Sequence, residues 1–307
     1  MGRFILKRLG QTLIVLFFVV LFAFIVVRLA PSDPARILAG DNASEETVEA
    51  IRESLGLNKS YPEQFFRYVA NILKGDLGTS IQYKLPCTEI IFPRVLVSAR
   101  LAFSTIVLVI LFSIPLGVIA GSKRGSFTDF FAMGVAMVGQ SLAPVWLCVF
   151  LIYIFSVKLG WLPAMGNDPG LKFVVLPVVA MGMQHIAGTT RMCRSEMIDV
   201  LGQDYITATR ARGISREEVR WKYALKNALA PVITLLGLRL GGMLAGTIIV
   251  ETIFVWPGVG QMLSQAVSTR DYPLVQSGLL ISACLVAMVN LVTDIINALI
   301  DPRITLN

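Results

Sequence analysis

The sequence has few of the residues that carry enzyme chemistry. Its 307 residues include one histidine and four cysteines, and only 15% are charged. No Gly-Lys pair occurs, which excludes the phosphate-binding loop G-x-x-x-x-G-K-[ST]. The motifs H-E-x-x-H of zinc proteases and G-x-S-x-G of hydrolases are also absent. We therefore predict a non-catalytic chain that binds no ATP or other cofactor and has no metal site.

The cysteines and the single histidine are predicted to be packing residues. Cys87, Cys148, Cys193 and Cys284 show no C-x-x-C spacing and lie at different levels of the chain. His185 lies within an apolar run, where a hydrogen-bonded packing residue or a pathway wall is the simpler interpretation than a metal ligand.

Long apolar segments are what the sequence has in abundance. A run of about 20 apolar residues crosses the hydrocarbon layer of a membrane, and several runs here have no polar face. Alternation typical of barrel strands is missing. We predict an all-α membrane protein with about six transmembrane helices. The candidate spans are Leu9–Val27, Leu101–Ser122, Phe130–Val157, Phe173–Thr190, Leu229–Val250 and Leu274–Ile300.

The net charge of +7 follows the membrane topology rather than a nucleic-acid surface. Basic residues flank the first span (Arg3, Lys7, Arg8), follow the second (Lys123, Arg124) and crowd the segment Arg191–Pro231. These positions lie on alternate sides of the spans, as the positive-inside rule requires of cytoplasmic loops. The pattern predicts two cytoplasmic termini and no nucleic-acid partner.

The segment Arg191–Pro231 is a polar island with eight basic and five acidic residues. Asp204 is a candidate N-cap for a short helix ending at Arg212, and Gly213 supplies a left-handed stop. Ser215 and Glu218 have the spacing of a capping box for a second helix. A short, capped helix of small residues on a cytoplasmic loop is suited to docking another protein.

These features divide the chain into three parts. Residues 1–30 form an N-terminal tail and the first span. Residues 31–99 form an external helical region, with one helix capped by Ser44 and a second opened by Pro62. Residues 100–307 form a five-helix transmembrane core that includes the cytoplasmic loop 191–231.

Four polar residues in or beside the spans are candidate pathway or gate residues. Gln140 and Ser141 precede Pro144 and predict a polar, kinked wall in the third span. Glu251 ends the fifth span near the outer face, as a gate, an interface residue or a plain interfacial position.

Arg239 lies inside the fifth span, where a charge must face protein or a wet cavity. Three roles are open for Arg239. It would line the path and bind a substrate carboxylate, or pair with an acidic residue of a partner subunit, or take part in packing alone. Gly237 and Gly241 near it have G-x-x-x-G spacing, which favours close helix packing, and we expect this at a subunit interface.

Several motifs resemble one family over nearly the whole chain. They are RLAPSDP at Arg28–Pro34, LGLNKSYPEQ at Leu55–Gln64, GDLGTS at Gly75–Ser80, DYITATRARG at Asp204–Gly213, NALAP at Asn227–Pro231, ETIFVWPGVG at Glu251–Gly260, RDYPLVQ at Arg270–Gln276 and DPRI at Asp301–Ile304. This set is similar to the permeases of ABC importers, in the dipeptide, oligopeptide and nickel branch, and to the first permease of the pair. Thr207 replaces the glutamate that the superfamily often has there.

The resemblance implies the type I ABC-importer permease fold in a bacterial or archaeal inner membrane. It implies a second homologous permease, two cytoplasmic ATPase subunits that hold ATP and Mg, and an external solute-binding protein. The ATPase-coupling residues would be Asp204, Tyr205, Thr207, Ala208, Arg210, Ala211, Arg212 and Gly213.

The expected cargo is a dipeptide or oligopeptide, with nickel or a metal chelate as the alternative within the family. A stand-alone secondary transporter and a membrane-embedded enzyme are the alternatives from other classes. The docking loop disfavours the transporter, and the lack of convergent acid, base or metal residues disfavours the enzyme.

Overall fold

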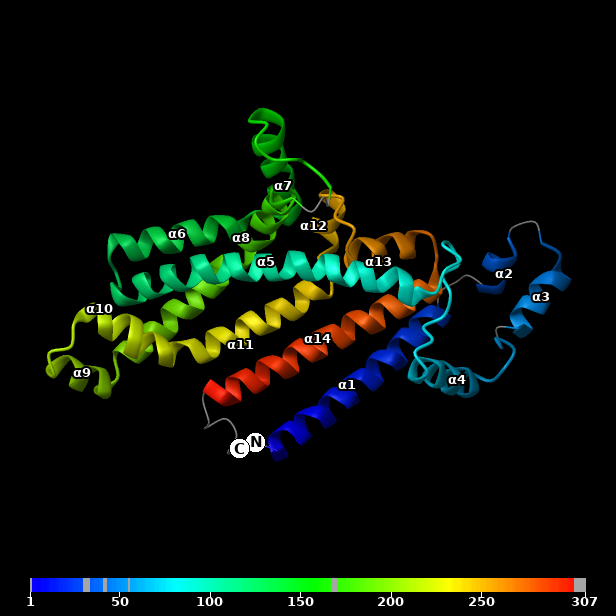
Figure 1. Cartoon of the computed structure of the whole chain (residues 1–307), viewed down its shortest axis with the longest axis horizontal. Helices are drawn as coiled ribbons and strands as arrows, with labels where there is room; N and C mark the ends of the chain where they lie inside the picture. Colours follow the sequence, from blue (N-terminus) through cyan, green and yellow to red (C-terminus); the bar gives the residue numbers. More distant parts are fainter. Residues whose placement is uncertain (1, 30–33, 41–42, 55, 167–169, 301–307) are drawn as a thin grey trace.

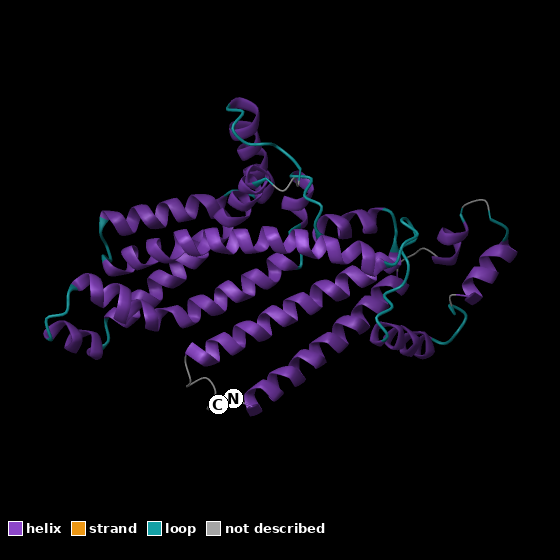
Figure 2. Cartoon of the chain, in the orientation of Figure 1, coloured by secondary structure: helices purple, strands orange, loops and turns teal. Residues whose placement is uncertain are grey.

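The computed structural model describes residues 2–29, 34–40, 43–54, 56–166 and 170–300. Within these ranges the chain is helical and contains no β-strand, as Figure 2 shows, apart from one isolated bridge between Thr79 and Pro86. Five helices are long and apolar enough to cross a membrane, and six do so if one bent pair counts as a single span. The predicted all-α fold with about six spans is confirmed.

Six long segments form the bundle. They are α1 (Gly2–Leu29), α5 (Cys87–Ser122), α6 (Phe127–Ser141) with α7 (Pro144–Leu151), α8 (Leu171–Leu201), α11 (Leu225–Leu244) and α14 (Tyr272–Ile300). The shorter elements are α2 (Pro34–Ala39), α3 (Glu45–Ser54), α4 (Tyr61–Leu73), α9 (Asp204–Ala211), α10 (Arg216–Glu218), α12 (Ile248–Ile253), α13 (Val259–Ser268) and the π-helical segments η1 (Ile152–Lys158) and η2 (Val219–Ala224).

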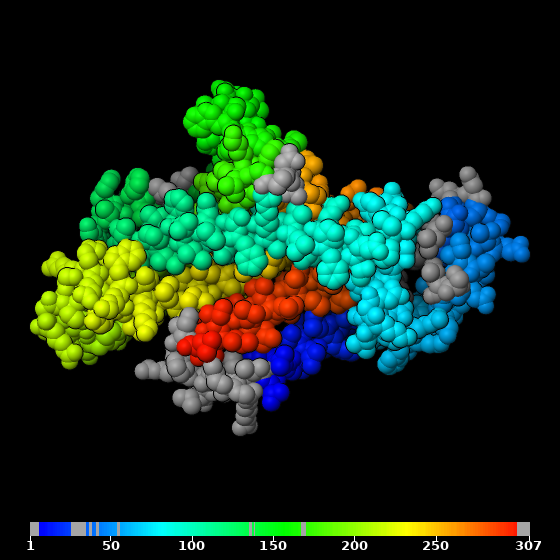
Figure 3. Space-filling model, viewed as in Figure 1, coloured from blue at the N-terminus to red at the C-terminus, as the bar shows by residue number. Residues whose placement is uncertain are grey.

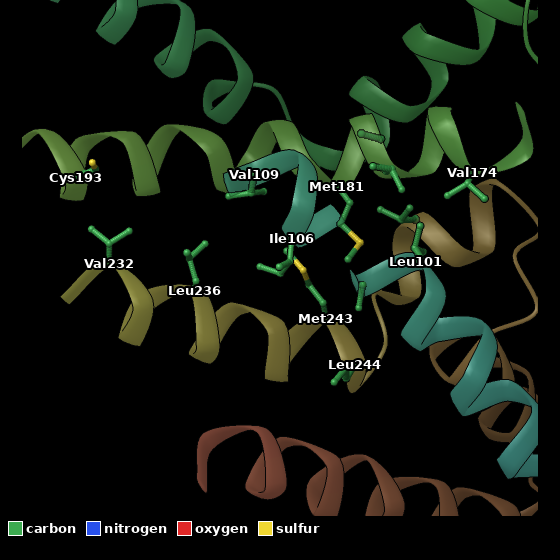
Figure 4. Packing of buried hydrophobic residues seen from close by; sticks show 14 of the residues in the cluster. Leu101, Ile106, Val109, Val174, Met181, Cys193, Val232, Leu236, Met243 and Leu244 are labelled. Atoms are coloured by element: carbon green, nitrogen blue, oxygen red, sulfur yellow. The ribbon is translucent and has the colours of Figure 1, made fainter. Parts of the chain in front are cut away.

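The core lies where α5, α8 and α11 meet. α5 packs along α8, α11 lies against both α8 and α14, and α1 covers α14 (Figure 1). Figure 4 shows Val232 and Leu236 pointing from α11 toward α8, which contributes Met181 and Cys193. Cys148 and Cys193 belong to this apolar cluster, which supports the predicted packing role of these cysteines.

Two helices run well beyond their predicted spans. α5 begins at Cys87 rather than Leu101, because Cys87 and Ile91 pack against α13. The predicted boundary between residues 99 and 100 therefore falls inside one continuous helix. α8 continues from Thr190 to Leu201, so Arg191 and Arg194 are helical residues rather than loop residues.

The predicted third span is broken. α6 ends at Ser141, Pro144 opens α7, and the two helices meet at 100°. Proline has no N–H to donate and disfavours helical geometry in the residue before it, so a kink at this place was expected. The observed bend is a full break, after which α7 packs against α8 and α12 instead of continuing the line of α6 (Figure 1).

The fifth span ends earlier than predicted. α11 ends at Leu244 rather than Val250, and the chain turns at Gly246 before α12 and α13 fold back along the bundle. Gly237 and Gly241 face α14, because a Cβ at Gly237 would collide with Thr293. This close approach is packing within the chain, and a subunit interface at this glycine pair stays a prediction.

The external region holds three helices rather than two. α2 was not predicted, whereas Ser44 caps α3 as expected through its hydroxyl and the Thr47 N–H, 3.3 Å apart. Pro62 is the second residue of α4, since that helix begins at Tyr61. The motif Asp301–Ile304 and most of Arg28–Pro34 lie outside the described residues.

The two ends of the bundle carry different structures. α9 and α10 project at one end, and α2, α3 and α4 lie at the other (Figures 1 and 3). The start of α1 and the end of α14 point toward the α9 end, where Arg8 and Asp294 form an ion pair of 3.2 Å.

A buried carboxylate holds the opposite end together. Asp271, fully buried before α14, accepts hydrogen bonds from the Ser80 hydroxyl and from the N–H groups of Ile81 (3.1 Å) and Gln82 (3.2 Å). It also accepts from the Leu274 N–H at 3.3 Å. These bonds tie the loop before α5 to the start of α14.

We expect Asp271→Asn to lower the free energy of unfolding by about 2 to 4 kcal/mol. The four donors share two carboxylate oxygens in Asp271, whereas an asparagine side chain has only one oxygen. A buried donor that loses its acceptor costs about 1 to 3 kcal/mol. Thermal unfolding of the purified protein in detergent measures the change. Glu89→Gln, an exposed carboxylate at the same end, is the control. An equal effect of the two substitutions would contradict the role of Asp271.

Candidate functional site

The candidate docking helix α9 spans Asp204–Ala211 and stands at the tip of the bundle. Gln203, not Asp204, is the N-cap residue, and no side-chain hydrogen bond closes this end. Asp204 lies in the first turn instead, where its negative charge favours the positive end of the helix dipole. The predicted helix is present, and its N-cap is shifted by one residue.

One side chain fastens α9 to the bundle. Ile206 is fully buried in the core cluster, together with Cys193 and Met197 of α8 and Val219 of η2. A second tie is polar, since the Asn227 amide donates to the Tyr205 hydroxyl at 3.0 Å. α9 is therefore linked to both α8 and the start of α11.

The opposite face of α9 is small and open. Thr207, Ala208 and Ala211 are exposed, and Ala208 lies about 200° around the helix from Ile206, at 100° per residue. Arg210 and Arg212 are also exposed, and neither forms an ion pair within the described residues. The surface combines small side chains, which allow close approach of a partner, with uncompensated positive charge.

The exit from α9 is fixed by local geometry. Gly213 has φ +82°, a left-handed conformation that favours glycine. Ser215 then caps α10, because its hydroxyl accepts from the Glu218 N–H at 3.2 Å. The stop at Gly213 and the cap at Ser215 are confirmed, and the Glu218 carboxylate accepts from Lys222 at 3.0 Å instead of closing the capping box. The stop and the cap place α9 at a set angle to η2 and α11.

A buried ion pair braces the same end of the bundle. Arg194 of α8 donates to both carboxylate oxygens of Asp129, at 2.6 and 2.7 Å. Asp129 also accepts from the Gly125 N–H at 3.0 Å in the turn between α5 and α6. This fork-shaped pairing fixes the start of α6 against α8.

The structure brings two of the candidate pathway residues to one helix. Gln140, exposed at the end of α6, accepts from Arg191 of α8 at 2.6 Å. Arg239 of α11 donates to the backbone carbonyl of His185, also on α8. Ser141 is exposed at the bend that follows Gln140. A pathway role for these residues stays a prediction.

Glu251 lies elsewhere, and its carboxylate is occupied. The side chain is 1% exposed and accepts from the Ser98 hydroxyl at 2.8 Å and the Gln261 N–H at 3.0 Å. Ser98 in turn accepts from the Val259 N–H at 2.9 Å. These bonds join α12 to α5 and α13. The geometry describes a structural link, and a gate at this position stays a prediction.

Sequence reasoning missed three residues that organise this region. In the sequence, Ile206 is one apolar residue within a polar loop. Its position on the inner face of the amphipathic helix α9 is the signal that could have identified it. Asp129 and Arg194 are 65 positions apart. Within the described residues, no group of three or more His, Cys, Asp or Glu side chains is arranged to hold a metal ion.

Comparison with known families gives two matches that together span most of the chain. Residues 113–306 match the family described as "Binding-protein-dependent transport system inner membrane component". Residues 1–98 match the N-terminal region of the same kind of transport-system membrane component.

Full-length relatives agree with these matches. The chain is 35% identical to the dipeptide transport system permease protein DppB of Alkalihalophilus pseudofirmus, over 99% of both chains. It is 36% identical to the glutathione transport system permease protein GsiC of Escherichia coli K12, and 38% identical to GsiC of Pectobacterium atrosepticum, again over 99% of both chains.

A solved structure shares the fold. The MetNI methionine ABC transporter in an inward-facing conformation matches with a TM-score of 0.58 and 16% identity. The match covers 70% of this chain and 97% of that chain. At this level of identity the likeness concerns the permease fold alone.

Proposed function

Because the chain belongs to the family of binding-protein-dependent transport system inner membrane components, the permeases of ABC importers, we propose that it forms the membrane path for small peptides together with a second permease. The observation that carries the peptide assignment is the full-length similarity to a dipeptide permease, supported by the glutathione permeases. The chain itself is a multi-pass membrane protein and has no catalytic role in this proposal.

ATP and Mg would be held by two cytoplasmic ATPase subunits that dock on α9. The exposed small face around Ala208 and the free cations Arg210 and Arg212 support this docking role. A solute-binding protein would deliver the peptide at the other end, near α2, α3 and α4. This orientation puts both termini in the cytoplasm, at the end to which α1 and α14 converge (Figure 1).

The coupling follows from how α9 is held. Closure of the ATPase pair would push on α9, and Ile206 would pass the motion to α8 and η2. Gly213 and the cap at Ser215 would keep the angle between α9 and α11 fixed. The spans would then rock, so that the path opens alternately to the outside and to the cytoplasm.

Reconstitution tests the peptide assignment. We expect proteoliposomes that hold this chain, the second permease and the ATPase subunits to accumulate a labelled dipeptide when ATP is enclosed and the binding protein is outside. The same liposomes without ATPase subunits should show no uptake. Accumulation without ATP would favour a stand-alone secondary transporter. Uptake of a nickel chelate with no peptide uptake would favour the metal alternative.

The docking role of α9 is tested by Ala208→Glu. A bulky charge on the small face should keep the ATPase subunits from seating closely, while insertion in the membrane stays normal. We expect uptake to fall to background, and substrate-stimulated ATP hydrolysis to fall with it. Ala208→Ser, which keeps a small, uncharged side chain at the same position, is the matched control and should leave uptake unchanged. Normal uptake and hydrolysis in Ala208→Glu would exclude docking at this face.

A further inference from the structure

Two arginines lie within the spanning helices without an acidic partner. In the described part of the chain, Arg191 makes one hydrogen bond, to Gln140, and Arg239 makes one, to the His185 carbonyl. With a rise of 1.5 Å per residue, Arg191 is roughly 15 Å from the Leu201 end of α8, and Arg239 is about 20 Å from the start of α11. Arg239 therefore lies within its span, whereas Arg191, one helical turn before Arg194 and its partner Asp129, lies nearer the end of the bundle that carries α9.

The Arg239 side chain of α11 reaches the part of α8 from which the Arg191 side chain extends. His185, Gly188 and Arg191 follow one another at steps of three residues, which places them on one helix face. The Arg239 guanidinium lies over Gly188, since a Cβ at Gly188 would collide with its Nη2 atom. Arg191 follows Gly188 by three residues, so its side chain leaves α8 about one turn from the Arg239 guanidinium.

Such a pair is costly unless an anion or water is present. Two positive charges repel each other strongly where the dielectric constant is low, and charges inside membranes pair or face a wet cavity. Each guanidinium has five N–H donors, of which one is used here. Gln140 and Arg191 are exposed, so this face of the chain is open to a ligand.

The ligand that fits this chemistry is a carboxylate. Its two oxygens accept parallel hydrogen bonds from the planar fork of a guanidinium, an arrangement that a point charge cannot reproduce. Peptides carry a C-terminal carboxylate whatever their side chains are. A site for this group would therefore bind many peptides through the C-terminal carboxylate that they share.

We propose that Arg191 and Arg239 form a binding site for the C-terminal carboxylate of the transported peptide. The site rests on the proposed peptide function. Arg191 belongs to α8 and Arg239 to α11, the two helices that meet at α9. Motion between them changes the separation of the two cations, so the site holds the carboxylate more tightly in one state than in the other.

The test compares a dipeptide with its C-terminal amide in the reconstituted complex. Uptake of both compounds is measured for wild type, Arg191→Gln, Arg239→Gln and the double variant, and expressed as the ratio of peptide to amide. Any preference of the binding protein is the same throughout and cancels between variants. We expect the ratio to fall by about tenfold in each single variant, since a hydrogen bond to a charged group contributes about 1.5 to 3 kcal/mol.

Two further variants separate charge, geometry and assembly. Arg239→Lys keeps the charge but loses the fork, so its ratio should lie between those of wild type and Arg239→Gln. Lys7→Gln removes one exposed positive charge from α1 and should leave the ratio unchanged. Co-purification of the second permease shows whether each complex assembles.

The outcomes are distinct. Wild-type peptide uptake with an unchanged ratio in Arg191→Gln and Arg239→Gln overturns the carboxylate site and leaves the peptide function standing. Loss of the second permease from Arg239→Gln, with no change of ratio in Arg191→Gln, overturns the site in favour of a subunit contact. Absence of uptake of both compounds by wild type overturns the peptide function and the site with it.

Discussion

The seating of Ile206 in the core is the contact on which the α9 end of the molecule depends. α9 is eight residues long and otherwise exposed, so it has little stability of its own. Ile206 belongs to the same buried cluster as Val219 of η2, and α9 lies against η2, so the helix is fixed to the end of the bundle. A force applied to its outer face then acts on the spanning helices instead of bending a loop.

Buried polar groups stabilise the two ends of the bundle. Asp129 with Arg194 braces the α9 end, and Asp271 braces the opposite end, each carboxylate satisfied by several donors. Glu251 is satisfied in the same way. Arg191 and Arg239 differ, because their donors are mostly unused. Satisfied groups fix the bundle, and the two cations with unused donors form the proposed site for a ligand.

Local signals predicted what local chemistry controls. The stop at Gly213 and the cap at Ser215 depend on residues within one helical turn, so the sequence pattern is sufficient to locate them. Span boundaries were less predictable, since charged residues interrupt an apolar run without ending the helix. α8 continues past Arg194 because Asp129 of α6 meets its charge, and Arg191 donates to the Gln140 amide of the same helix. Those partners come from a different helix, and no periodicity within α8 reveals them.

The break at Pro144 shows the same limit. Proline predicts a kink, but the size of the bend depends on what α7 packs against, and that is a matter of tertiary structure. The glycines of α11 are similar, because G-x-x-x-G spacing predicts close packing but does not identify the neighbouring helix. Contact with Thr293 of α14 decides it here.

The most direct test of the link between docking and transport uses the complete complex with Ile206→Ala in this chain. The quantity measured is the ratio of peptide taken up to ATP hydrolysed. Removing a buried isoleucine side chain costs about 2 to 5 kcal/mol of packing, which should loosen α9 from the core without altering its outer face. We expect the ATPase subunits to co-purify as in wild type and the ratio to fall. A wild-type ratio with an assembled complex would contradict mechanical coupling through Ile206.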